Sequence, residues 1–154
     1  MTPDNTKNLY EAFPRLYRGR DKSPQASSMH WGFQCEDGWF DLIWNLSQAI
    51  EDEARGRGLK PQSEEWPEAT QVKQKFGTLR FGLVSCSDTT DVLTHEARLA
   101  SENICEVCGA IASSVDNAQR WCQTLCSKHA EEFLRNSSLA RNQNQPPIWK
   151  SKKD

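Results

Sequence analysis

Two pairs of metal-binding side chains near the C-terminus constrain this chain more than any other feature of its sequence. Cys105 and Cys108 form a C-x2-C pair, and Cys126 and His129 form a C-x2-H pair after a spacing of seventeen residues. Two thiolates so spaced can bind one ion from a tight turn, in which Gly109 suits a positive-φ position. Four protein ligands of soft and borderline type fit a tetrahedral Zn²⁺ and leave no open position. The pattern therefore predicts one structural zinc ion.

The ligand set has alternatives within the same sequence. Cys122 could replace His129 as the fourth ligand. Cys35 and Cys86 lie far from the cluster and are expected to be small core residues. A redox pair is the other interpretation of C-x2-C, but it requires no distant second pair. The segment 110–124 is long enough for a short hairpin. A knuckle, a hairpin and a helix that carries the last two ligands predict a treble-clef arrangement.

Upstream of the metal pattern, the apolar periodicity predicts helices. Apolar residues recur at helical spacing from Trp39 to about Gly56, and again over residues 88–104. A shorter helix is expected over residues 8–16, where Pro14 interrupts it. These three segments supply amphipathic faces for a core.

The strand signals lie between these helices. Residues 71–85 predict a β-hairpin that turns at Gly77. Residues 29–35 predict a strand or a packed turn, and residues 59–69 a connecting loop into which Trp66 can be tucked. The expected fold class is therefore α+β, with amphipathic helices packed on a small antiparallel hairpin or sheet.

These segments predict an organisation in three parts. We expect an α+β body over residues 1–104 and a treble-clef-like zinc module over residues 105–135, packed on the body. A flexible tail is expected over residues 136–154, which are rich in Asn, Gln, Pro and Lys.

Composition narrows the class of protein. The chain has 154 residues, 36% of them hydrophobic, and a formal net charge of −2 at pH 7. Its apolar runs are too short for a transmembrane helix, and its N-terminus lacks the pattern of a signal peptide. Six cysteines without a secretion signal indicate a reducing compartment, where thiols bind metal more often than they form disulfides. We therefore expect neither a membrane protein nor a secreted disulfide scaffold.

Several fragments of the chain resemble one group of proteins. Its members are small, poorly characterised proteins of bacteriophages and prophages, in which these fragments tend to be QVKEKFG-G-LRFY, ICExCG and W-x-x-TLC-x-x-C. The resemblance covers most of residues 10–130. In this chain the matching fragments are QVKQKFGTLRF at 71–81, ICEVCG at 104–109, WCQTLC at 121–126, FPRLY at 13–17 and GWFDLI at 38–43.

This chain departs from the pattern of that group at three positions. Thr78 and Gly82 stand where Gly and Tyr are usual, and His129 stands where Cys is usual. Histidine keeps a zinc ligand, so the metal site is retained, whereas the missing Tyr puts any shared contact of that side chain in doubt. The resemblance implies a phage or mobile-element accessory protein that works in the cytoplasm of a bacterial host.

The first functional hypothesis is a non-enzymatic protein that binds and modulates or inhibits a host protein, such as a defence nuclease or regulator. The acidic body could dock on a basic host surface. Trp66 and Trp149 would be good interface anchors if they are exposed. The sequence does not indicate an oligomeric state.

The second hypothesis is nucleic-acid binding through the zinc module and the hairpin. Lys73, Lys75 and Arg80 flank Phe76 and Phe81, a basic and aromatic mixture that suits backbone and base contacts. The alternative is ordinary strand alternation, with the cations outward and the aromatic rings in the core.

The third hypothesis is a metal-dependent nuclease. Its side chains would come from His30, Glu36, Asp37, Asp41 and His95. However, turn and helix-start positions already explain the acids, and the sequence holds no nucleophile motif or phosphate-binding loop. We therefore expect a binding protein without catalytic residues.

Overall fold

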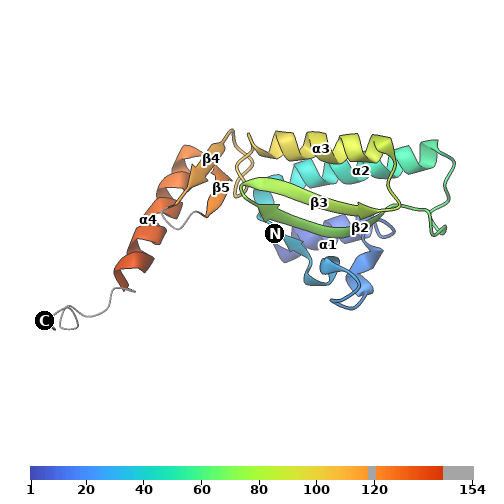
Figure 1. Cartoon of the computed structure of the whole chain (residues 1–154), viewed down its shortest axis with the longest axis horizontal. Helices are drawn as coiled ribbons and strands as arrows, with labels where there is room; N and C mark the ends of the chain where they lie inside the picture. Colours follow the sequence, from blue (N-terminus) through green and yellow to red (C-terminus); the bar gives the residue numbers. More distant parts are fainter. Residues whose placement is uncertain (118–120, 144–154) are drawn as a thin grey trace, which may run out of the picture.

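A computed structural model describes residues 1–117 and 121–143, with side chains to residue 137, and has an α+β fold (Figure 1). This confirms the expected fold class. The α-helices are α1 (Pro3–Ala12), α2 (Phe40–Gly56), α3 (Asp88–Ser101) and α4 (Ser127–Gln143). The strands are β1 (Phe33–Gln34), β2 (Glu68–Lys75), β3 (Thr78–Val84), β4 (Ser113–Asp116) and β5 (Cys122–Leu125). Short 3-10 helices are η1 (Arg18–Asp21), η2 (Ser28–Trp31) and η3 (Asp37–Trp39).

The body contains a three-stranded sheet in the order β1-β2-β3. β2 and β3 form the predicted antiparallel hairpin, and its two-residue turn is Phe76-Gly77, with φ of 54° and 75°. Two positive φ angles match the right-handed twist of the flanking strands. β1 pairs in parallel with β2, Phe33 opposite Val72. The sheet is therefore mixed rather than purely antiparallel, because residues 29–35 contribute a short strand that reaches β2 from a distant part of the chain.

The predicted helices are present with shifted ends. α2 follows its prediction closely, whereas α3 ends at Ser101 rather than at Ile104. A reciprocal capping box of Ser87 and Thr90 starts α3. α1 begins at Pro3 and ends before Pro14, earlier than expected, because proline suits a first helical turn and disfavours helix in the residue before it.

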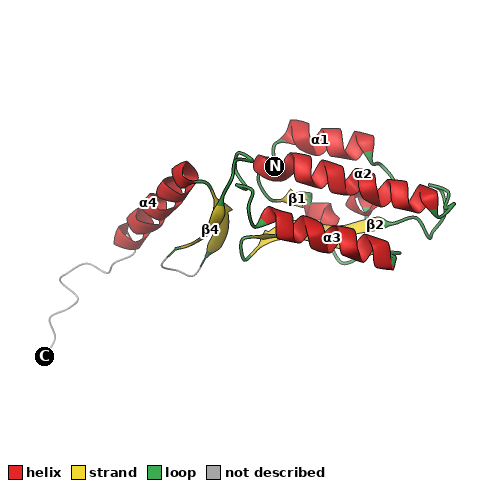
Figure 2. Ribbon diagram, turned by 90° about the horizontal axis from the view of Figure 1, so that it is seen from above, coloured by secondary structure: helices red, strands yellow, loops and turns green. Residues whose placement is uncertain are grey.

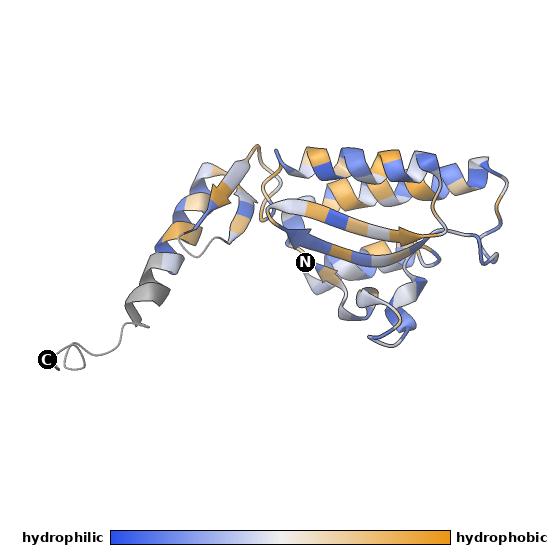
Figure 3. Ribbon diagram, viewed as in Figure 1, coloured by the Kyte–Doolittle hydropathy of each residue, from blue (hydrophilic) through white to orange (hydrophobic). Residues whose placement is uncertain are grey.

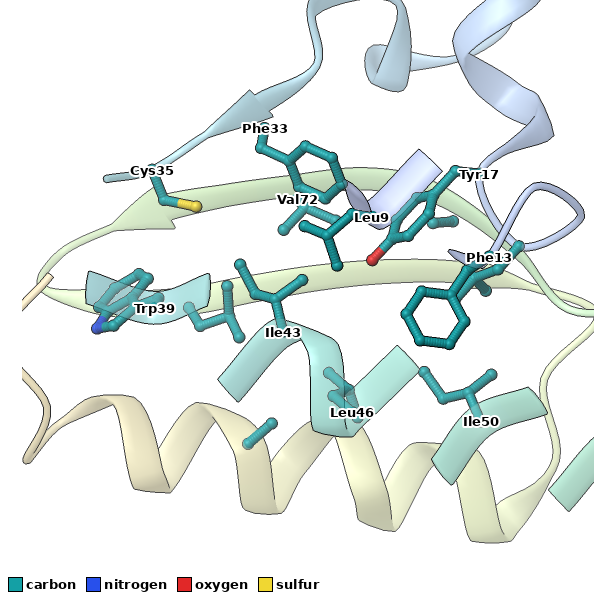
Figure 4. Packing of buried hydrophobic residues seen from close by; sticks show 14 of the residues in the cluster. Leu9, Phe13, Tyr17, Phe33, Cys35, Trp39, Ile43, Leu46, Ile50 and Val72 are labelled. Atoms are coloured by element: carbon teal, nitrogen blue, oxygen red, sulfur yellow. The ribbon is translucent and has the colours of Figure 1, made fainter. Parts of the chain in front are cut away.

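The core fills the space between the sheet and the helices of the body. α2 packs along α3, and α1 lies beside α2 in the view of Figure 2. Trp39, Tyr17 and Trp66 are fully buried. Figure 4 shows Trp39 and Tyr17 packed among other side chains of the main hydrophobic cluster. The other core side chains include Leu9, Phe13, Leu16, Met29, Phe33, Ile43, Leu46, Ile50, Val72 and Leu79. Each large side chain contributes about 1.5–3 kcal/mol of burial free energy.

β4, β5 and α4 form a separate lobe beyond one end of the sheet (Figure 1). α4 continues to Gln143, past residue 135, where the zinc module was expected to end. The sequence offers no glycine or proline between Ser127 and Pro146 to stop the helix earlier. The rest of the predicted tail, residues 144–154, lies outside the described residues.

A buried carboxylate joins η1 to the sheet. Glu68, at the start of β2, is 3% exposed, and its Oε2 lies 2.8 Å from Arg18 Nε. Lys22 Nζ contacts the other carboxylate oxygen. The Arg18 guanidinium also donates to the carbonyls of Trp66 at 2.9 Å and Pro67 at 3.1 Å. Arg18 therefore both neutralises a buried charge and holds the loop that precedes β2.

Replacing Arg18 with alanine should destabilise the body. R18A leaves the Glu68 carboxylate buried with one cationic partner instead of two, so we expect the free energy of unfolding to fall by about 3 kcal/mol. The control R57A removes an exposed arginine whose ion pair with Glu53 spans 3.7 Å, and should cost less than about 0.5 kcal/mol. Urea unfolding monitored by tryptophan fluorescence measures both. Equal losses in the two variants would contradict the role of Arg18.

Candidate metal centre

The first two candidate ligands lie on a tight turn that closes at Gly109. The Gly109 N–H donates to the Cys105 carbonyl at 2.8 Å, and the Cys105 N–H donates to the Ala110 carbonyl at 2.7 Å. Gly109 has φ of +76°, which a side chain would strain. The turn thus presents Cys105 and Cys108 toward one point, as the glycine at this spacing predicted.

The other two candidate ligands lie where a hairpin leads into a helix. β4 and β5 pair antiparallel, with Asp116 opposite Cys122, and so return the chain toward the turn. Cys126 stands between β5 and α4, and its carbonyl accepts the Ala130 N–H at 2.9 Å. His129 follows in the first turn of α4, on the same side as Cys126. A knuckle, a hairpin and a helix follow one another as expected.

The four donor atoms converge to the dimensions of a tetrahedral site. All of them lie within 4.8 Å of one another. Cys108 Sγ lies 3.8 Å from Cys126 Sγ, and His129 Nδ1 lies 3.4 Å from Cys105 Sγ and 3.3 Å from Cys126 Sγ. Tetrahedral zinc with Zn–S of about 2.3 Å and Zn–N of about 2.05 Å separates two sulfurs by about 3.8 Å and a sulfur from a nitrogen by about 3.6 Å. The donor set therefore fits one ion.

One thiol of the cluster is already poised to lose its proton. A hydrogen bond from the His129 backbone N–H to the sulfur lowers the pKa of the Cys126 thiol to about 7. A thiolate is the form that binds metal. Within residues 1–117 and 121–137, these four residues are the one group of three or more Cys, His, Asp or Glu side chains placed to hold a metal ion.

The remaining cysteines lie outside the cluster. Cys122 Sγ lies 3.0 Å from Ser114 Oγ and faces the turn at Gly77, so the structure favours His129 as the fourth donor. Cys35 is buried, as expected, and burial raises the pKa of its thiol to about 12. The expectation for Cys86 is wrong, because its side chain is exposed in the segment between β3 and α3.

The turn of residues 105–109, which carries Cys105 and Cys108 and which we call the metal turn, contacts the body directly at Gly38. A Cβ atom at this position would lie 2.1 Å from the Cys105 carbonyl oxygen, and 2.5 Å and 2.6 Å from the backbone nitrogens of Gly109 and Cys108. The Gly38 N–H donates to the Glu106 carbonyl at 2.7 Å. Only a residue without a side chain allows the two backbones to approach this closely.

Three further hydrogen bonds secure the module. Trp39 Nε1 donates to the Ile104 carbonyl at 2.9 Å, and Thr124 Oγ1 donates to the Gly77 carbonyl at 2.6 Å. Glu106 is 3% exposed, and one of its carboxylate oxygens accepts the Glu36 N–H at 3.3 Å. Burial raises the pKa of the Glu106 carboxyl to about 7.

Sequence reasoning missed these supporting residues. Gly38 and Trp39 belong to the GWFDLI fragment, and Glu106 and Thr124 to the two cysteine-containing fragments. Their occurrence in the same fragments as the ligands was the available signal, but one sequence does not say which residues touch across the fold.

The predicted partner-binding residues divide into three groups. Lys73, Lys75 and Arg80 lie on the sheet, Lys75 and Arg80 exposed and Lys73 half-buried. The prediction for Trp66 is wrong, because this side chain is fully buried, with the Arg55 guanidinium 5.7 Å from the centre of its ring, and leaves no ring at the surface. Trp149 lies outside the described residues.

The side chains of the nuclease hypothesis have other surroundings. Asp37 Oδ1 accepts the Thr2 N–H at 2.7 Å and the Asn5 amide at 3.0 Å, so this carboxylate holds the start of α1. His30 and His95 are exposed on η2 and α3. Among the described residues, these side chains do not meet Glu36 and Asp41 in a group that could hold a metal ion.

Comparisons with protein-family models, with curated proteins and with solved structures gave no match for this chain. The resemblance to phage and prophage proteins therefore stays a prediction. No helix in the described part of the chain combines the length and the apolar character that a membrane crossing requires.

Substitution of His129 and Cys122 should separate the two candidates for the fourth ligand. With Zn²⁺ as the probe, H129A should lose more affinity than the roughly 10- to 100-fold that a lost supporting hydrogen bond costs at a metal site. H129C keeps a donor and should bind one ion per chain, as should C122S. Competition with a chromophoric chelator measures the affinities. Loss of zinc from C122S with retention in H129A would reverse the assignment.

The close approach at Gly38 predicts a second effect on metal binding. G38A forces a methyl group into the backbone of the metal turn, so zinc affinity should fall about 10- to 100-fold although all four ligands remain. G56A is the control, because a Cβ there has nothing within 4 Å. Zinc affinity and hydrogen exchange of residues 105–126 provide the measurement. Wild-type values for G38A would show that the contact does not support the site.

Proposed function

We propose that this protein is a zinc-stabilised accessory protein of phage type, which acts in the bacterial cytoplasm by binding a host protein rather than by catalysis. The donor set supports zinc as the metal, because three thiolates and one imidazole in tetrahedral dimensions suit Zn²⁺. Four protein donors fill its coordination, which supports a structural role.

The small core of the module supports the same role. Within residues 105–117 and 121–137, Cys105 and Leu125 are the buried hydrophobic residues, whereas Ile111 and Trp121 are 91% and 62% exposed. So little apolar burial cannot stabilise an independent unit. Metal binding would supply the missing free energy, on the order of 10–16 kcal/mol for sites of this kind.

The observation that supports a protein partner is a hollow between α1 and α2. Its volume is about 600 Å³. Phe40 and Trp44 form an aromatic floor, with ring centroids 5.7 Å apart. The carboxylates of Glu11 and Asp41 are exposed on its rim. The lining is completed by Asn8 and Ala12.

The charge of this hollow indicates the kind of partner. Among the described residues, no lysine or arginine lines it, and Lys7 forms an exposed ion pair with Glu11 at 3.8 Å. Aromatic floor and acidic rim together suit an amphipathic segment with basic side chains at its edges. This agrees with the expectation that the acidic body docks on a basic host surface.

Affinity capture with charge variants tests this function. Wild-type protein should retain a host protein from nuclease-treated bacterial lysate, and E11K/D41K should retain at least about tenfold less, because two attractive charges become repulsive. The control E65K/E96K makes the same charge change at exposed positions on a loop and on α3. Quantitative mass spectrometry compares the three.

Two results would contradict the proposal. One is equal loss in E11K/D41K and in the control, which would indicate an effect of net charge alone. The other is that nothing is retained once nucleic acid has been digested.

A further inference from the structure

The outer face of the β2–β3 hairpin carries three cations. Val72 and Leu79 point into the core, so the alternating positions on the same strands face away from it. Lys73 pairs with Arg80 across the strands, and Lys75 lies two residues further along β2. In Figures 1 and 2 the helices of the body lie over the other face and the upper edge of this sheet. Figure 3 shows the resulting alternation of hydrophilic and hydrophobic residues along the two strands.

These cations have no acidic partners in the described structure. None of the ion pairs recorded within residues 1–117 and 121–137 involves Lys73, Lys75 or Arg80. By contrast, Arg18, Arg55 and other basic residues of the body are paired with carboxylates. The chain as a whole is acidic, so an unneutralised cationic face indicates an anionic ligand.

Two exposed aromatic rings adjoin the cations. Phe76, at the hairpin turn, is 69% exposed, and Trp121, before β5, is 62% exposed. Both line a hollow of about 250 Å³. The ammonium group of Lys75 lies 5.4 Å from the centre of the Phe76 ring. Lys75 and Phe76 also line a second hollow of about 360 Å³, which Lys73 and Arg80 line as well, so Lys75 and Phe76 belong to both hollows.

Two hydrogen bonds hold together the segments that carry these two rings. Gln74 donates from its amide to the Cys122 carbonyl, and Thr124 Oγ1 donates to the Gly77 carbonyl. These bonds join the end of the β2–β3 hairpin in the body to β5 of the C-terminal module. The aromatic hollow is therefore built from both parts of the protein.

Acidic groups lie along one border of this surface. Glu36 is exposed and Glu106 is buried, and both line a third hollow with Lys73 and Trp121. An anionic chain would therefore lie over the β2–β3 side of Trp121 and avoid the β1 side. Lys73 stands between the two regions.

We propose that this cationic–aromatic face, formed by Lys73, Lys75, Arg80, Phe76 and Trp121, binds single-stranded nucleic acid. Phosphates would contact the cations, and unpaired bases would stack on the two rings. A duplex keeps its bases stacked inside and offers no free face to the rings, and an acidic peptide would use the cations alone. This site lies on the sheet, apart from the α1–α2 hollow, and does not depend on the proposed protein partner.

Fluorescence anisotropy with a labelled 12-nucleotide oligo(dT) or oligo(U) tests the site on the full zinc-loaded chain. Wild-type protein should bind, with a slope of log affinity against log salt of about −2 for three phosphate contacts. K73E/R80E should bind at least about tenfold more weakly, with a smaller salt slope. F76A/W121A should bind about tenfold more weakly with an unchanged slope, because stacking does not release counterions.

Controls separate the site from general charge and from misfolding. K7E/K60E makes the same charge change on α1 and on a loop, and should bind as wild type does. Zinc content of one ion per chain, together with a far-UV circular dichroism spectrum equal to that of the wild type, shows that the module and the body of each variant are folded. F76N replaces F76A if the turn fails, because asparagine tolerates positive φ.

Three outcomes would overturn the proposal. The first is absence of binding by the zinc-loaded wild type at low salt. The second is equal loss in K73E/R80E and K7E/K60E. The third is equal affinity for a 12-base-pair duplex or full competition by polyglutamate, which would indicate that charge alone is recognised.

Discussion

The contact between Gly38 and the backbone of the metal turn is the constraint on which the arrangement of the whole molecule depends. Without a side chain at Gly38, the carbonyl of Cys105 and the amides of Cys108 and Gly109 can lie against η3. The metal ligands alone would close the module on itself. It is this backbone contact, together with the hydrogen bond from Trp39 to Ile104, that places the module at one end of the sheet.

That placement gives the molecule two surfaces of opposite character. The α1–α2 hollow has an aromatic floor and an acidic rim, whereas the outer face of β2–β3 is cationic and continues onto Trp121 of the module. The net charge of −2 does not reveal that acidic and basic side chains are concentrated on different surfaces. The two surfaces lie on different elements, so the proposed protein and nucleic-acid partners would not compete for one site.

Local signals predicted the elements whose stability is mainly local. The spacing of the cysteines and His129 predicted the four donors, and Gly77 predicted the turn of the hairpin. Predictions failed where a residue's surroundings come from distant parts of the chain. The parallel pairing of Phe33 with Val72 has no local signal, and Trp66 is buried because Arg18 and Glu68 hold its loop against the body.

The sequence by itself determined the fold class, the candidate metal ligands and the alternation that turns Lys73 and Arg80 away from the core. These depend on spacing along the chain, which is the period of a strand or the reach of a tight turn. Only the tertiary structure decided which glycine contacts the turn of Cys105 and Cys108, which tryptophans are exposed, and that Phe76 and Trp121 line one hollow. The reason is that these properties arise from contacts between residues far apart in sequence, and side-chain type alone does not specify such contacts.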